Sequence, residues 1–264
     1  LLIADLATGG RLLPAYDHLV VDEAHHLEEV TTDQLTQRVD WAWLHVQLQR
    51  LSPGARGGAL LARGACGSGW PPWAGGFTHL AHRGGAPRRD LVDLAERLVN
   101  LTTGLEGVRA EGGYPQRVAL DSRLRSQPAW SQLEVEWDSA GATLRHLVAD
   151  LASLVEELDH AQWWQAEPEA TLFAELRGVY EAVQQSSQQL DTIILGAKSG
   201  EGLVKWLELN ENADTVLLAA APLYVNTVIQ QGLVQRRRSA IFTSATLRTG
   251  ASFDFIRERL GLWD

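Results

Sequence analysis

The fold is decided by the stretch Leu-Val-Val-Asp-Glu-Ala-His at residues 19–25. Its first three residues are apolar and partly β-branched, and a segment of helix-forming composition follows them. Such a run is typical of a buried parallel strand in an α/β sheet. We therefore expect Asp22 and Glu23 at the carboxyl end of a strand, the edge at which open α/β sheets bind their ligands.

A stretch of the same kind lies near the other end of the sequence. It reads Ser-Ala-Ile-Phe-Thr-Ser-Ala-Thr-Leu at residues 239–247, and its first five residues predict another buried strand. Further strands are predicted at 204–209 and 214–218, and a helix at 222–234. Both ends of the chain therefore supply sheet elements, which predicts an α/β fold with a partial parallel sheet.

The middle of the sequence predicts helices. Apolar residues recur there at steps of three and four in three stripes: Leu91, Leu94, Leu98, Leu101, Leu105 and Val108; Leu144, Leu147, Leu151, Leu154 and Leu158; Leu172, Leu176, Val179 and Val183. Burying five leucines gains on the order of 10 kcal/mol, so the stripes predict a packed helical bundle rather than a ligand groove. Gly and Pro are so frequent at 51–89 that we expect a long loop there.

Composition restricts the class of protein further. The 264 residues are 45% hydrophobic and 21% charged, as in a folded protein of about two domains. The formal charge of −10 argues against coating nucleic acid by bulk attraction. No signal peptide or membrane-length apolar run is visible, and Cys66 has no disulfide partner, so we expect a soluble cytoplasmic protein. Because the sequence begins with Leu1 and contains no Met, we expect it to be a piece of a longer protein.

The adjacent carboxylates of Asp22 and Glu23 suit hydrolysis of a phosphoanhydride. One can hold Mg²⁺, and the other can orient or deprotonate the attacking water. The alternative is an acidic helix N-terminus, where carboxylates favour the positive end of the helix dipole. The two residues alone favour this simpler explanation.

The two stretches together resemble motif II, a DEAH box, and motif III of superfamily 2 helicases. Further residues make the sequence similar to DinG/XPD-like DNA helicases. They are Leu1–Leu6, His26-Leu27-Glu28, Ala221-Pro222-Leu223, Ser252–Phe255 and Leu260–Leu262. The resemblance covers residues 1–40 and 200–264, whereas the middle matches in position and helical character.

The resemblance implies a domain organisation. Residues 1–42 would be the first part of a RecA-like motor domain and residues 201–264 its second part. Residues 43–200 would be the helical arch insertion, which overhangs the path of single-stranded DNA and contains the loop at 51–89.

The resemblance also implies roles for five residues. Asp22 would hold the Mg²⁺ of bound ATP, and Glu23 would contact the nucleotide and act on the hydrolytic water. His25 would sense the γ-phosphate. Ser244 and Thr246 would couple hydrolysis to movement on DNA.

Other parts of such a motor are not found in these residues. No Gly-x-x-x-x-Gly-Lys-Ser/Thr pattern occurs in the sequence, and no second motor domain follows motif III. We therefore expect this chain alone to be inactive as an ATPase. The family's iron–sulfur cluster lies before motif II, and a single cysteine, Cys66, cannot bind one within this chain.

The function implied is that of an ATP-dependent DNA helicase in DNA repair or replication. It would translocate 5′ to 3′ on single-stranded DNA and unwind forked or duplex DNA, as a monomer without membrane contact. The alternative is a helical DNA- or protein-binding module with vestigial motor elements. An ATP-dependent nuclease is a third option, because some DinG-like proteins carry an exonuclease domain, but no residue here bears on it.

The loop at 51–89 contains a second candidate site. It has no acidic residue, and its arginines alternate with aromatic residues. The candidates for contact with nucleic acid are Arg56, Arg63, Trp70, Trp73, Arg83, Arg88 and Arg89. Arginine on phosphates and aromatics on bases is the chemistry of sequence-tolerant single-strand binding. A basic linker is the alternative, and the composition favours it.

Overall fold

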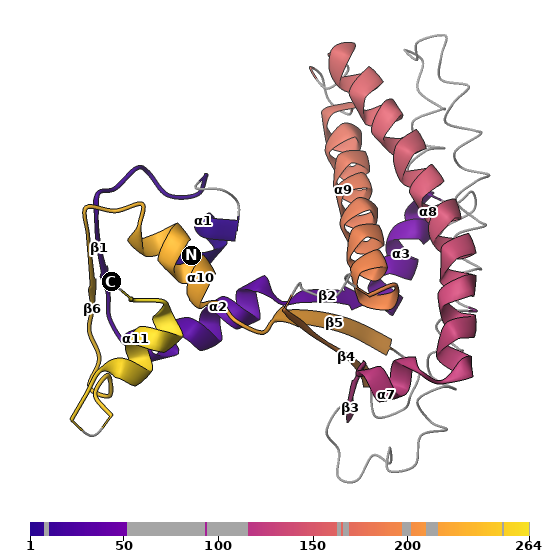
Figure 1. Cartoon of the computed structure of the whole chain (residues 1–264). Coiled ribbons are helices and arrows are strands. Elements are labelled where there is room, and N and C mark those ends of the chain that lie inside the picture. Colours follow the sequence, from indigo (N-terminus) through magenta and orange to yellow (C-terminus); the bar gives the residue numbers. More distant parts are fainter. Residues whose placement is uncertain are drawn as a thin grey trace. The chain divides into compact units, whose positions relative to one another are not determined.

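A computed structural model of the chain forms two compact units (Figure 1). The structure describes residues 1–7, 11–51, 93, 116–162, 165, 169–196, 202–209, 216–249 and 251–263. Unit 1 consists of Leu1–Gln37, Lys198–Val204 and Ala220–Asp264, and unit 2 of Arg38–Ala197 and Lys205–Ala219. The predicted α/β fold is confirmed, because a parallel pair of strands from the chain ends encloses a helical insertion.

The sheet of unit 1 joins the two stretches that carry the candidate site. Strand β1 (His18–Val21) pairs in parallel with β6 (Ser239–Phe242). Their register aligns His18 with Ser239 and Val21 with Phe242. Both strands lie where the sequence predicts them, and they end at matching positions.

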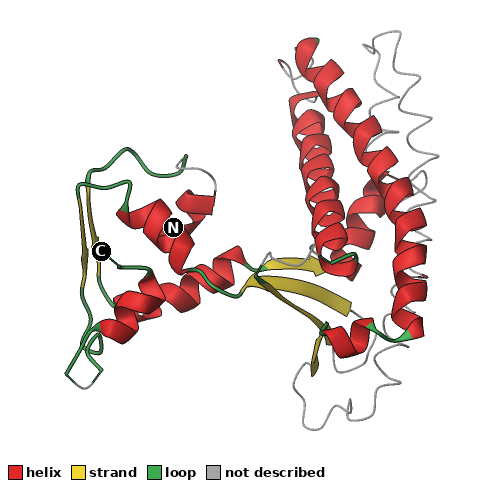
Figure 2. Cartoon of the chain, in the orientation of Figure 1, coloured by secondary structure: helices red, strands yellow, loops and turns green. Residues whose placement is uncertain are grey.

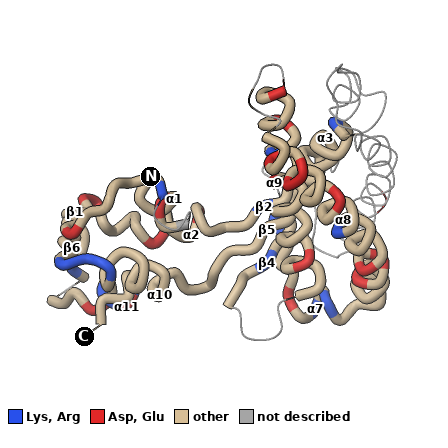
Figure 3. Tube along the Cα trace, turned by 90° about the horizontal axis from the view of Figure 1, so that it is seen from above, with Lys and Arg blue, Asp and Glu red and all other residues tan. Residues whose placement is uncertain are grey.

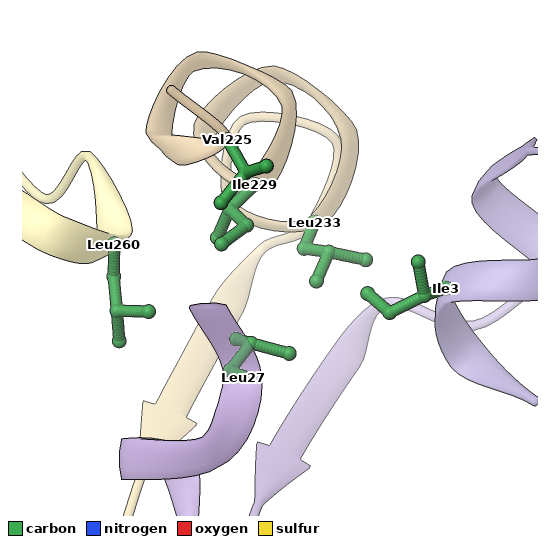
Figure 4. Close-up of a cluster of buried hydrophobic side chains, with 6 residues drawn as sticks. All are labelled: Ile3, Leu27, Val225, Ile229, Leu233 and Leu260. Atoms are coloured by element: carbon green, nitrogen blue, oxygen red, sulfur yellow. The ribbon is translucent and has the colours of Figure 1, made fainter. Parts of the chain in front are cut away.

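Short helices cover one side of this sheet. They are α1 (Leu2–Ala7), α2 (Leu27–Leu35), α10 (Asn226–Ile229) and α11 (Asp254–Leu260), and a π-helical segment, η4 (Gln230–Val234), continues α10. Figure 4 shows the buried side chains that converge from them: Ile3, Leu27, Val225, Ile229, Leu233 and Leu260. The helix predicted at 222–234 is confirmed, although its first turn starts at Asn226.

The strands of unit 1 differ from the predicted buried strands in one respect. Leu19 and Phe242 pack against the core, but Val20 and Ile241 on the opposite face are 65% and 53% exposed. Within the described residues this sheet has only two strands, so nothing covers that face. Parallel sheets normally have both faces covered.

Unit 2 contains a second sheet with the strand order β2-β5-β4-β3. The strands are β2 (Gln37–Asp40), β5 (Val216–Pro222), β4 (Leu203–Leu209) and β3 (Gln116–Ala119), and β3 pairs antiparallel with β4. The sequence predicts β4 and the first three residues of β5. Both pair within this second sheet, with β2 and β3 at its edges, rather than with the sheet of unit 1.

Helices of very different length pack beside this sheet (Figure 2). They are α3 (Trp41–Leu51), α7 (Ser122–Arg125), α8 (Pro128–His160) and α9 (Glu169–Ile194), and α9 contacts both α8 and α3. Helices α8 and α9 contain two of the predicted leucine stripes and bury them. The stripe at 91–108 and the loop at 52–89 lie outside the described residues. Among the described helices, none is long and apolar enough to cross a membrane.

The C-terminal end of α9 is held by basic side chains. Arg125 donates to the carbonyl oxygens of Ile193 (2.6 Å) and Ile194 (3.1 Å), and Lys205 Nζ donates to that of Thr192. The last carbonyls of a helix have no partner within the helix, and cations there also complement its dipole. Gly196 follows with φ of +77°, the left-handed conformation that commonly ends a helix.

Candidate functional site

The backbone aligns the ends of β1 and β6 beyond the strands themselves. The N–H of Thr243 donates to the carbonyl of Val21 (2.9 Å), and the N–H of the fully buried Ala24 donates to the carbonyl of Thr243 (2.9 Å). These two bonds continue the parallel ladder for one more step. They place the residues that follow each strand beside one another.

Glu23 adopts a strained conformation at this edge. Its φ of 52° and ψ of 42° are left-handed, and it lies directly before the short helix η1 (Ala24–His26). This conformation costs a residue with a Cβ roughly 1–2 kcal/mol. Two backbone hydrogen bonds maintain it. The N–H of Ala24 donates to the carbonyl of Thr243, and the N–H of His26 donates to the carbonyl of Glu23 (3.0 Å). Strain of this kind clusters at functional sites.

Asp22 is held by a hydroxyl from the other strand. Thr243 Oγ1 donates to Asp22 Oδ1 at 2.6 Å. This bond, together with the backbone N–H of Glu23, lowers the pKa of the Asp22 carboxyl. Both interactions favour the charged form. Asp22 is therefore an exposed carboxylate, the type of ligand that Mg²⁺ takes in combination with substrate phosphates.

Glu23, His25 and Ser244 form a triangle of close polar contacts, two of which are hydrogen bonds. His25 Nδ1 lies 2.7 Å from Ser244 Oγ and 3.2 Å from Glu23 Oε2, and Ser244 Oγ donates to Glu23 Oε2 at 3.2 Å. Ser244 gives its one hydroxyl proton to the Glu23 carboxylate, so its oxygen can only accept a hydrogen bond from His25 Nδ1. The triangle is therefore consistent when His25 carries its proton on Nδ1.

Thr246 completes the cluster. Its backbone N–H donates to Ser244 Oγ at 3.3 Å, and its Oγ1 lies 3.4 Å from the same oxygen. The Ser244 hydroxyl thus accepts from Thr246 and donates to Glu23. The Ser244 oxygen therefore links Thr246 to the Glu23 carboxylate.

The structure brings together the five residues predicted for the nucleotide site. Asp22, Glu23 and His25 follow β1, and Ser244 and Thr246 follow β6. Their individual roles stay predictions. The seven candidates for nucleic-acid contact, Arg56, Arg63, Trp70, Trp73, Arg83, Arg88 and Arg89, lie outside the described residues. In the described ranges no cluster of three or more His, Cys, Asp or Glu side chains could hold a metal ion by itself.

Sequence reasoning missed Thr243, which holds Asp22. Part of the signal was available, because Asp22 directly follows its predicted strand and Thr243 is the last residue of the other predicted strand. In a parallel pair that starts and ends in register, such residues must face each other. No sequence feature predicted the left-handed conformation of Glu23, since glutamate rarely adopts it.

The fold and this edge define a class: an α/β protein with acidic and hydroxyl side chains gathered at the carboxyl ends of parallel strands, where such folds bind ligands. Comparison with known proteins narrows the class. The chain is 25% identical over 280 residues to the protein named 3'-5' exonuclease DinG of Bacillus subtilis (strain 168), covering 100% of this chain. It is 24% identical over 253 residues to the Probable ATP-dependent helicase YpvA of the same organism, covering 96%. No family model matches.

The chain is therefore distantly related to these two proteins. It corresponds to a segment of these proteins, because the matches span 28% and 31% of the two relatives.

Proposed function

We propose that this chain is part of an ATP-dependent DNA helicase and supplies the acidic edge of its ATP-hydrolysing site. The observation that carries the proposal is the triangle of Glu23, His25 and Ser244, which joins two segments 219 to 221 residues apart. In a motor domain that had lost its activity, we would not expect a strained Glu23 to be retained in contact with side chains of both segments. The relation to helicases supports the same assignment.

Each residue of this edge has a distinct task in the proposal. Asp22, charged because Thr243 donates to it, would hold the Mg²⁺ of ATP. The bound ion supplies charge neutralisation at the phosphates. Glu23 would orient the attacking water and accept its proton on the carboxylate. His25, Ser244 and Thr246 would hold that carboxylate in position and couple it to the segment after β6.

Further parts of the site would come from outside these residues. The sequence contains no Walker A pattern for the nucleotide phosphates. The exposed apolar side chains of Val20 and Ile241 support a larger sheet in the whole protein. In that protein, the helical unit would be the arch insertion. The motor would move 5′ to 3′ on single-stranded DNA and unwind forked or duplex DNA as a monomer, in DNA repair or replication.

Replacing Glu23 in the full-length protein tests the proposal. Glu23→Gln keeps the shape of the side chain but removes the base, so DNA-stimulated ATP turnover is expected to fall about 10²- to 10⁴-fold. Binding of a fluorescent ATP analogue should stay within a few-fold of wild type. Glu29→Gln is the matched control, because Glu29 is an exposed carboxylate of α2 outside the triangle.

Two outcomes would contradict the proposal. Turnover of Glu23→Gln equal to that of the control would remove Glu23 from the chemistry. No turnover in the full-length wild type, with DNA present, would favour the alternative of a non-catalytic binding module.

A further inference from the structure

Three consecutive arginines, Arg236–Arg238, lead into the amino end of β6, and Figure 3 shows this basic stretch beside the strand. We propose that they bind phosphates of a nucleic-acid backbone, at the opposite end of the β1/β6 sheet from the acidic edge. The choice of nucleic acid as the partner rests on the proposed helicase function.

The backbone of the arginine stretch is fixed to the start of the sheet. The N–H of Arg237 donates to the carbonyl of Val234 (3.1 Å), and the N–H of Arg238 donates to that of Asp17 (2.8 Å). The guanidinium of Arg237 lies 3.8 Å from the centre of the Tyr16 ring and donates to the carbonyl of Arg236 at 3.3 Å. The side chain of Arg237, which lies between Arg236 and Arg238 in the sequence, is thus held in place by Tyr16 and by the backbone.

The side chains of Arg236 and Arg238 are available to a ligand. The Arg238 side chain is 78% exposed, and its Nε lies 3.7 Å from a carboxylate oxygen of Asp17, which is itself 67% exposed. An exposed ion pair of this kind contributes under about 1 kcal/mol, so a phosphate can compete with it. Arg236 is exposed and, within the described part of the chain, has no ion-pair partner.

Distance separates these arginines from the acidic edge. Four residue steps of a strand lie between His18, at the amino end of β1, and Asp22, which corresponds to roughly 13 Å. The Debye length at physiological salt is about 8 Å, so Asp22 and Glu23 cancel little of the positive charge. Because the chain has a formal charge of −10, attraction of a polyanion must come from such a local concentration.

The spacing of the two exposed guanidinium groups suits a partner with a row of phosphates. A planar guanidinium binds two phosphate oxygens at once. Arg236 and Arg238 are at most about 7 Å apart along the backbone. A nucleic-acid strand presents a charge for about every 3.4 Å of its axis, so neighbouring phosphates can reach both.

The test measures binding of the chain to a fluorescent 20-nucleotide oligo-dT by anisotropy at several KCl concentrations. For Arg236→Ala/Arg238→Ala, the slope of log affinity against log salt should decrease by about 1.4, which is about tenfold in affinity at 0.15 M salt. Arg236→Lys/Arg238→Lys keeps the charge and should restore most of the slope. Arg123→Ala/Arg177→Ala is the charge-matched control, since Arg177 already pairs with Glu181 and Arg123 is an exposed residue of α7.

The outcomes separate this inference from the proposed motor. Absent oligonucleotide binding by the wild-type chain, an unchanged slope in the alanine variant, or equal displacement by polyglutamate would each overturn the arginine site. DNA-independent ATP turnover of the full-length protein should be unchanged in the arginine variant. If Glu23→Gln leaves turnover intact while the arginine variant loses binding, the motor proposal fails and the phosphate site stands.

Discussion

The two units of this chain are stabilised in different ways. Unit 2 buries continuous stripes along α8 and α9, including the fully buried Trp130 and Trp137. Unit 1 has a small core beneath a two-stranded sheet, and it exposes Val20 and Ile241. The candidate site belongs to unit 1. Its side chains are therefore positioned by hydrogen bonds between strand ends rather than by deep burial.

This difference indicates that the two units differ in how easily they open locally. Segments with few buried contacts open at lower free energy than packed helices do. The nucleotide response that we propose for the acidic edge would require such a segment. The helical unit, in contrast, can serve as a rigid body. The comparison leads to three predictions about stability and pH.

The largest effect is expected from removing a core aromatic of unit 2. Trp137→Ala leaves a cavity and deprives Asp191 of a hydrogen bond from the indole (2.9 Å), so it should cost about 3–5 kcal/mol. Hydrogen exchange followed by mass spectrometry should show the loss in α8 and α9. Trp43→Ala, at a 46% exposed position of α3, is the control and should change little. An equal loss of protection in β1 and β6 would show that the units unfold together, against the comparison.

An intermediate effect is expected from two glycines, one in each unit. Gly261 ends α11 with φ of +70°, and a Cβ there would lie 2.4 Å from the carbonyl oxygen of Asn226. Gly261→Ala should therefore destabilise unit 1 by roughly 1–3 kcal/mol. Gly178→Ala, in α9 with open space around it, should stabilise unit 2 by up to about 1 kcal/mol. Exchange rates of α11 and α9 measure both, and effects of the same sign would contradict this account.

The smallest effect concerns the pH dependence of the site. The pKa of Asp22 is lowered by the Thr243 hydroxyl and the Glu23 N–H, so its carboxylate stabilises unit 1 above pH of about 4. That contribution is lost as the pH falls through the lowered pKa. Thr243→Val should raise the pKa of Asp22 towards its ordinary value and thereby reduce the loss at acid pH.

Carboxyl-carbon NMR of Asp22 during a pH titration measures this change directly. Thr243→Ser keeps the hydroxyl and is the control, with a pKa close to that of the wild type. If the valine variant titrates like the serine variant, the hydrogen bond does not set the charge of Asp22.

Local patterns predicted β1, β6, α8 and α9, but not β2, β3, α7 or α11. The β-branched run before Asp22, the similar run before Ser244 and the leucine stripes at 144–158 and 172–183 were sufficient, because strand and helix periods are properties of short segments. The five site residues followed from the resemblance of the flanking motifs. The pairing of β4 and β5 with β2 and β3 was not predicted, since strand partners are chosen by edges supplied elsewhere in the chain.

The amino-acid sequence by itself determined the positions of β1, β4 and β6, the helical insertion and the acid pair at a strand end. Only the tertiary structure decided that Thr243 holds Asp22, that Glu23 is strained, and that one hydroxyl of Ser244 joins both segments. The physical reason is the distance along the sequence over which each interaction acts. Backbone periodicity acts over a few residues, whereas a hydrogen bond between residues 221 positions apart exists only after the two strands have paired in register.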